Sequence, residues 1–130
     1  MRRDLSMRLL QLSDPHLLAD PLGQCHGRPS LEWLRHGLRQ ALAEVGPPDL
    51  LLITGDLCED LSWGGYALLR DLLAPLPFPV ALLSGNHDHP FLLRAVLGRR
   101  AVLAPASLPL AGGRLLCLES HRPGWVGGWL

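Results

Sequence analysis

Residue types that bind metal ions recur at three separate places in this 130-residue sequence. They are Asp14 with His16, then Asp56, and then Asn86 with His87. An aspartate and a histidine separated by one residue can chelate a single cation. Together these carboxylates, imidazoles and the amide form a mixed set of oxygen and nitrogen donors, which suits Fe, Mn, Zn or Co. Taken singly, each place could also be an ordinary turn, because Asp-Pro and Gly-Asn pairs are common in turns.

Hydrolysis of a phosphate ester is the chemistry that such a set can perform. Asp56 can bridge two cations, one held by Asp14 and His16 and the other by Asn86. Paired metal ions about 3.5 to 4 Å apart bind the oxygens of a phosphate and lower the pKa of a bridging water, which then attacks near neutral pH. The residues therefore predict a site for two divalent or trivalent transition-metal ions.

Further polar side chains lie close to these ligands in the sequence. His87 follows the amide ligand directly, so its ring could protonate the leaving oxygen or stabilise developing charge. Glu59 or Asp60 could orient that ring. His26 and His89 are candidates for contacts with the substrate or with the ligands, and the alternative, favoured for His26, is that they are exposed loop residues.

Composition and motifs exclude several other classes of protein. The 12 basic and 12 acidic residues balance, so no polybasic surface is expected for nucleic acid or anionic membranes. The motifs G-x-x-x-x-G-K and G-x-S-x-G are absent, which argues against a phosphate-binding loop and a serine nucleophile. We see neither a signal peptide nor a run of membrane-spanning length, and expect a cytoplasmic protein. Three widely spaced cysteines fit a reducing compartment, and we interpret all three as packing residues.

Aliphatic runs and helical spacing define the elements that must position the site. We predict strands over residues 7–12, 49–54 and 79–84, and helices over residues 31–45 and 66–73. Residues 17–28 form a loop that suits the rim of an active site. Residues 101–120 offer short strands around a Gly112-Gly113 turn.

The alternation of strands and helices is typical of an open parallel α/β sheet with right-handed crossovers. Ligands bind such sheets beyond the carboxyl ends of the strands. Each predicted strand is followed there by one of the metal-binding groups, so we expect the three groups to meet. Asp14 precedes a proline, which favours an extended backbone at that residue.

These residues resemble a known family. Asp14-Pro15-His16, Gly55-Asp56 and Gly85-Asn86-His87-Asp88 are similar to the first three blocks (D-x-H, G-D and G-N-H-D/E) of the calcineurin-like metallophosphoesterases. Neighbouring residues, including Leu22-Gly23 and Leu57, look closest to the bacterial class III cyclic-nucleotide phosphodiesterases. The resemblance covers nearly all of the chain from Met7 onward.

The resemblance implies a fold, a substrate and residue roles. The fold would be part of an αββα sandwich, with a mostly parallel sheet and flanking helices. Asp14 and His16 would bind the first metal ion, Asp56 would bridge, Asn86 would bind the second ion, and His87 would assist catalysis. The substrate would be a small phosphodiester, cyclic AMP being favoured.

The sequence departs from the family pattern at its end. Family members continue with a histidine-bearing strand end and a G-H-x-H segment, which supply three further imidazoles. This sequence stops at Leu130 before either, and His121 alone cannot fill three places. We expect residues 1–6 to be a loose extension and residues 7–130 to be the N-terminal portion of the domain, with the second half of the sandwich missing.

A site that lacks several ligands should bind metal weakly and hydrolyse little. An apolar sheet face left open would also favour self-association. The alternative to a hydrolase is a non-catalytic relic or interaction module that retains half of the fold.

Overall fold

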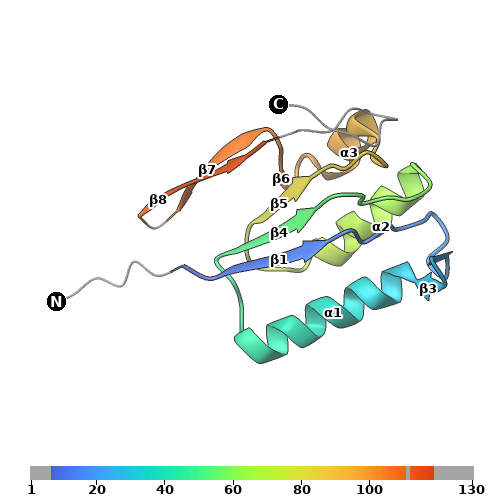
Figure 1. The fold of residues 1–130 in the computed structure, drawn as a ribbon, viewed down its shortest axis with the longest axis horizontal. Helices are drawn as coiled ribbons and strands as arrows, with labels where there is room; N and C mark the ends of the chain where they lie inside the picture. The colour runs from blue at the N-terminus through green and yellow to red at the C-terminus, as the bar shows by residue number, and fades with distance from the viewer. Residues whose placement is uncertain (1–6, 111, 119–130) are drawn as a thin grey trace.

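A computed structural model describes residues 7–110 and 112–118 of the chain. The predicted extension 1–6 and His121 lie outside the described residues. A four-stranded parallel sheet in the order β1-β4-β5-β6 forms the centre (Figure 1). Its strands are β1 (Leu9–Ser13), β4 (Leu50–Thr54), β5 (Val80–Leu83) and β6 (Val102–Leu103). The three predicted strands and their parallel arrangement are therefore confirmed.

Three helices pack on one face of this sheet. They are α1 (Ser30–Val45), α2 (Trp63–Leu73) and α3 (Pro90–Leu97). The apolar spacing correctly predicted α1 and α2, and α2 begins at Trp63. The Ser62 hydroxyl accepts a hydrogen bond from the Gly65 backbone N–H and so caps its first turn. Helix α3 was not predicted from the sequence.

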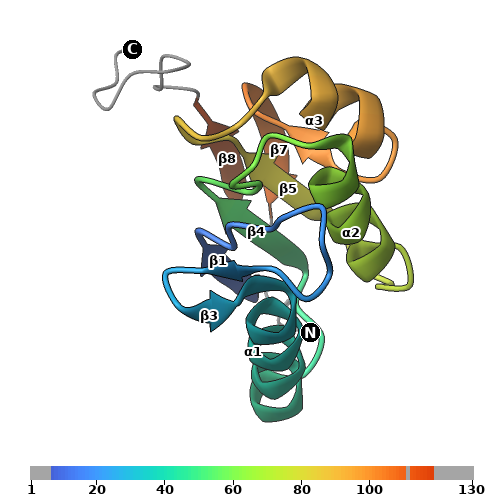
Figure 2. The same ribbon diagram turned by 90° about the vertical axis from the view of Figure 1, so that its right-hand side faces the viewer.

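A small antiparallel hairpin covers part of the opposite face. It consists of β7 (Ala106–Leu110) and β8 (Gly113–Cys117), and of the expected turn residues Gly112 lies between the strands while Gly113 begins β8 and pairs with Leu110. Figure 2 shows the hairpin on one side of the sheet and the helices on the other. The strand β4 is buried on both faces as a result, and its side chains divide between two apolar clusters. The mostly parallel sheet with flanking helices agrees with the predicted α/β fold.

The cluster on the helix side is the larger. It combines Leu51 and Ile53 of β4 with side chains from all three helices. On the hairpin side, Leu50 and Leu52 pack against Cys117. Beyond the hairpin, β1 presents Leu9, Gln11 and Ser13 to solvent, so this open strip is partly polar. Self-association through it remains a prediction.

The predicted rim loop contains structure of its own. Strands β2 (Gln24–Cys25) and β3 (Arg28–Pro29) pair antiparallel, with His26 and Gly27 at the turn. Both turn residues have positive φ, 54° and 77°. This short hairpin leads directly into α1. Within the part of the chain that the structure describes, no helix combines the length and apolar character needed to span a membrane.

Candidate metal centre

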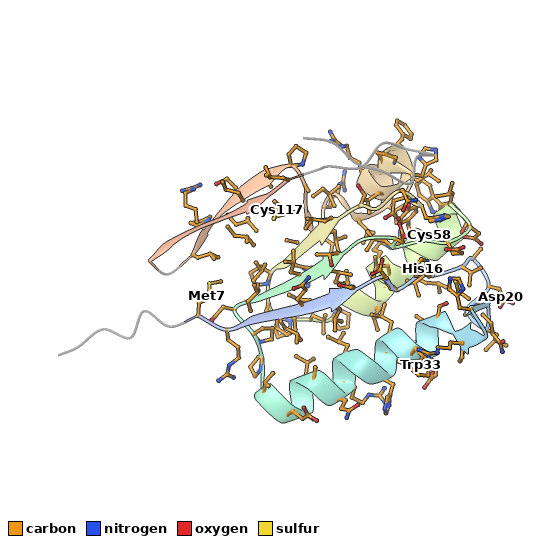
Figure 3. The ribbon with its side chains drawn as sticks, in the orientation of Figure 1. Met7, His16, Asp20, Trp33, Cys58 and Cys117 are labelled. Atoms are coloured by element: carbon orange, nitrogen blue, oxygen red, sulfur yellow. The ribbon has the colours of Figure 1, made fainter. Side chains whose placement is uncertain are left out.

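The predicted ligands follow the carboxyl ends of three adjacent strands. Ser13 of β1 pairs with Thr54 of β4, and Thr54 pairs with Leu83 of β5. Backbone hydrogen bonds continue this order past the strands, because Asp14 N–H donates to the Thr54 carbonyl at 2.9 Å and His16 N–H to the Asp56 carbonyl at 2.9 Å. Figure 3 shows His16 at this end of the sheet. The parallel register thus sets the first two groups of ligands side by side.

Asp14, His16 and Asp56 form one cluster. Each offers a ligand atom, and the three atoms lie within 4.8 Å of one another. His16 Nε2 is 4.0 Å from Asp56 Oδ2. Asp14 is exposed, while the other two side chains are half-buried, so an ion could reach the cluster from solvent. Two carboxylates and an imidazole are donors that Fe, Mn, Zn or Co accepts. The donor set of the described residues therefore fits a transition-metal ion.

Glu59 orients the imidazole of His16. Its Oε2 atom lies 2.7 Å from His16 Nδ1, and a carboxylate accepts, so Nδ1 is the donor in this contact and Nε2 is the ring nitrogen that would bind a metal ion. We expected Glu59 or Asp60 to orient His87, but Glu59 contacts His16 instead. The reason is a parallel bridge between Leu17 and Cys58 that continues the β1–β4 pairing past the strand ends.

The loop with Asn86 and His87 packs against Asp56. His87 N–H donates to Asp56 Oδ1 at 3.0 Å, and the exposed His87 ring has its centroid 6.4 Å from that of His16. A Cβ on Gly85 would lie 2.2 Å from Asp56 Oδ1, a distance that only glycine permits. Asn86 lies in this loop between Gly85 and His87 and is half-buried. The second predicted ligand position is therefore a neighbour of the Asp56 carboxylate.

Hydrogen bonds to Asp88 join the loop after β4 to the loop after β5. Its carboxylate is 3% exposed and accepts hydrogen bonds from the N–H groups of Leu57, Cys58 and Gly85 and from the Tyr66 hydroxyl. Burial raises the pKa of Asp88, although these hydrogen bonds act in the opposite direction. In the sequence, the position of Asp88 in the G-N-H-D block was the one signal available for this residue.

Two other predicted residues have structural partners. His89 Nδ1 accepts from Leu92 N–H at 3.2 Å and so caps α3. Asp60 accepts from Ala19 N–H at 3.0 Å and from the Ser62 hydroxyl at 2.6 Å. Burial acts to raise the pKa of Asp60, but the hydrogen bonds outweigh it and hold the pKa below its usual value. Neither side chain belongs to the cluster of Asp14, His16 and Asp56.

The backbone at the first two ligands is strained. Asp14 and His16 have φ values of 54° and 48°, in the left-handed region that costs a non-glycine residue about 1 to 2 kcal/mol. The expectation of an extended Asp14 is therefore wrong. Its N–H bond to the Thr54 carbonyl outweighs the preference of a residue before proline. Gly55 is also left-handed at 71°, and a Cβ there would lie 2.8 Å from Asp14 Oδ1. Such strain is often found at functional sites.

Cys25 is a neighbour of the site, although we interpreted it from the sequence as a packing residue. Cys58 and Cys117 are buried in the apolar clusters, which confirms them as packing residues. Cys25 is only half-buried, and its sulfur lies within 4.8 Å of ligand atoms of His16 and Glu59. Burial, and then the charge of Glu59, raise the pKa of its thiol. The β2–β3 hairpin brings Cys25 there, and its sequence position carried no signal of that.

A cavity of about 460 Å³ adjoins the cluster. Asp14 and His16 line one part of it, and the hairpin and α1 contribute His26, Arg28 and Trp33. The ring centroids of His16 and His26 are 5.9 Å apart. His26, a predicted substrate contact, therefore faces the same space as the ligands.

Comparisons with known proteins point to one family. The chain matches the calcineurin-like phosphoesterase family over residues 7–127. It is 47% identical over 128 residues to a probable cyclic nucleotide phosphodiesterase of Synechococcus sp. strain WH7803, covering 93% of this chain and 48% of that protein. It is 34% identical over 128 residues to the 3',5'-cyclic adenosine monophosphate phosphodiesterase CpdA of Pseudomonas aeruginosa, covering 98% of this chain and 46% of that protein. The chain thus spans about half the length of these curated relatives.

Proposed function

The chain belongs to the calcineurin-like phosphoesterase family, and from this premise we propose that it carries the metal site of a phosphodiesterase that hydrolyses a 3',5'-cyclic nucleotide, with cyclic AMP favoured. The observation that supports the proposal most is the cluster of Asp14, His16 and Asp56 at the ends of adjacent strands. The substrate class comes from the names of the relatives. A cytoplasmic location stays a prediction.

Each residue has a part in this proposal. Asp14, His16, Asp56 and Asn86 would together hold the metal ions, Asp56 being the carboxylate between the other two groups. When bound, such ions supply an activated water and neutralise the charge of the phosphate. Glu59 keeps the His16 ring in the tautomer that leaves Nε2 free. His87, exposed next to Asp56, donates a proton to the leaving oxygen.

We further propose that the isolated chain binds metal weakly and turns over slowly. Asp14, His16, Asp56 and Asn86 are few protein donors for two ions, and each ion usually takes at least three or four ligands. No contact among residues 7–110 and 112–118 favours the alternative of a non-catalytic interaction module.

Metal binding is the direct test. The purified chain, first stripped of metal, is titrated with Mn²⁺ and free Mn²⁺ is followed by electron paramagnetic resonance. Asp56→Asn should lose Mn²⁺ binding, because a neutral amide cannot bridge two cations as a carboxylate does. Glu44→Gln is the matched control, since Glu44 is exposed near the end of α1. The carbonyl of Val45, the next residue, accepts a hydrogen bond from Arg8, which precedes β1 and so lies at the amino end of the strands, away from the cluster.

Activity is measured on the same samples with cyclic AMP and with bis(p-nitrophenyl) phosphate. The proposal expects Mn²⁺-dependent hydrolysis that Asp56→Asn abolishes and Glu44→Gln preserves. Equal Mn²⁺ uptake by the wild-type chain and Asp56→Asn would contradict the proposed site. Robust turnover by the wild-type chain would contradict the proposal that it is weak alone.

A further inference from the structure

The cavity beside the metal centre is too large for a phosphate group alone. Its volume of about 460 Å³ falls within the range of about 300 to 1,000 Å³ that is typical of small-molecule sites. Asp14 and His16 belong both to its lining and to the ligand cluster. A phosphoester held by the cluster would therefore have one of its organic substituents beside or inside this cavity.

The cavity wall away from the cluster is aromatic and cationic. The guanidinium carbon of Arg28 lies 4.5 Å from the ring centroid of Trp33, within the range of a cation–π contact. Arg28 comes from β3, and Trp33 lies in the first turn of α1. Figure 3 shows Trp33 near this end of α1, at the same end of the molecule as His16.

Trp33 is not part of either apolar cluster. It is 56% exposed, whereas its neighbours Leu31 and Leu34 are buried in the core. A large aromatic side chain kept at the edge of a cavity, with an arginine held over its face, offers a planar surface. Nucleobases stack on aromatic rings and on guanidinium groups of this kind.

We propose that this cavity binds the nucleoside part of the substrate, with the base stacked against the Arg28–Trp33 pair and the phosphate directed toward Asp14 and His16. The inference rests on the proposed function for the position of the phosphate. A glycerol or other flexible alcohol would gain little from this pair, because it has no π face. Trp33 and Arg28 thus set the preference for a nucleotide over other phosphodiesters.

Equilibrium binding tests the inference without requiring turnover. Calorimetric titrations of the full chain use adenosine, 5'-AMP and ribose 5-phosphate, each with and without Mn²⁺. The wild-type chain should bind 5'-AMP more tightly than ribose 5-phosphate. Trp33→Ala should weaken adenosine and 5'-AMP binding by roughly 5- to 150-fold, the range that one base–aromatic stack contributes. Ribose 5-phosphate binding should stay the same.

Two further variants keep the test specific. Trp33→Phe retains an aromatic face and should keep most of the preference, even if Trp33→Ala folds poorly. Trp63→Ala removes a similarly exposed indole, 54% exposed, at the start of α2 and outside the cavity lining, and should have no effect. A purely structural Arg28–Trp33 contact would change the free energy of unfolding but not the ratio of 5'-AMP to ribose 5-phosphate affinity.

The outcomes separate this inference from the proposed function. Adenosine binding that depends on Trp33 supports nucleoside binding in the cavity even if the chain fails to bind Mn²⁺. In that case only the proposed metal-dependent function is contradicted. Mn²⁺ and ribose 5-phosphate binding with equal affinity for 5'-AMP would overturn the inference and leave the proposed function standing. An unchanged 5'-AMP preference in Trp33→Ala would also overturn it.

Discussion

Replacing Gly85 by alanine should damage both the fold and the candidate metal centre. A Cβ at this position would lie 2.2 Å from Asp56 Oδ1 and 2.5 Å from the Asp56 backbone nitrogen. Rotation of the carboxylate relieves only the first contact, because the second is to the backbone. The loop must therefore move by about half an ångström merely to reach 3.0 Å, the closest approach of real Cβ atoms.

That movement has an energetic cost that the contacts allow us to bound. Overpacking of a tight site typically costs about 1 to 3 kcal/mol. The 2.7 Å hydrogen bond from Gly85 N–H to the buried Asp88 would be strained at the same time. We therefore expect Gly85→Ala to lower the free energy of unfolding by about 2 kcal/mol, within the range for such changes.

Urea unfolding followed by circular dichroism measures the loss of free energy of unfolding. Titration with Mn²⁺ measures the loss of metal affinity that a displaced Asp56 carboxylate should cause. Gly37→Ala is the matched control, because a Cβ there meets nothing within 4 Å. Gly37 lies inside α1, so alanine should instead raise the free energy of unfolding by about 0.5 to 1 kcal/mol. A Gly85→Ala variant with wild-type stability and wild-type Mn²⁺ affinity would refute the reasoning.

Tyr66 and Ser62 give two further predictions. Tyr66→Phe removes the hydroxyl that donates to buried Asp88 at 2.9 Å, and should cost about 1 to 3 kcal/mol in urea unfolding. Burial, and the charge of Asp88, raise the pKa of Tyr66 above its ordinary value of 10.0. As the pH rises, the unfolded chain therefore loses the phenol proton before the folded chain does, and the free energy of unfolding of the wild-type chain should fall above pH 10. The difference in free energy of unfolding between the wild-type chain and Tyr66→Phe should then become smaller. A difference that stays constant with pH would contradict this prediction. Ser62→Ala removes the cap of α2 and should cost about 1 kcal/mol in thermal unfolding, whereas an unchanged midpoint would argue against the cap.

The sequence was sufficient to predict the elements whose patterns are local. The run Leu50–Thr54 is aliphatic because β4 is buried on both faces, and the leucine spacing of α1 reflects a single buried side. The meeting of Asp14 and His16 with Asp56 followed from one rule, that parallel strands present their carboxyl ends at the same edge. Long-range packing was not needed for either inference.

Features that depend on long-range contacts were not predictable in this way. Helix α3 is only eight residues long, and its cap, His89, is of a type that also suggested chemistry. Glu59 reaches His16 because the β1–β4 pairing extends past both strands, which no spacing reveals. The fold of the β2–β3 hairpin brings Cys25 to His16 and Glu59 and brings Arg28 to the cavity, and these contacts join segments that share no sequence pattern.

The left-handed backbone at Asp14 and His16 has a consequence for how this chain can change. Glycine adopts such conformations freely, so a glycine at either position would relieve about 1 to 2 kcal/mol of strain. It would also delete a side chain of the ligand cluster. Relief of backbone strain alone would therefore favour glycine at both positions. This gain is offset by the greater entropy that glycine gives the unfolded chain and, at position 16, by loss of the hydrogen bond to Glu59. The aspartate and the histidine thus keep a strained backbone at two positions where the ligand cluster requires their side chains.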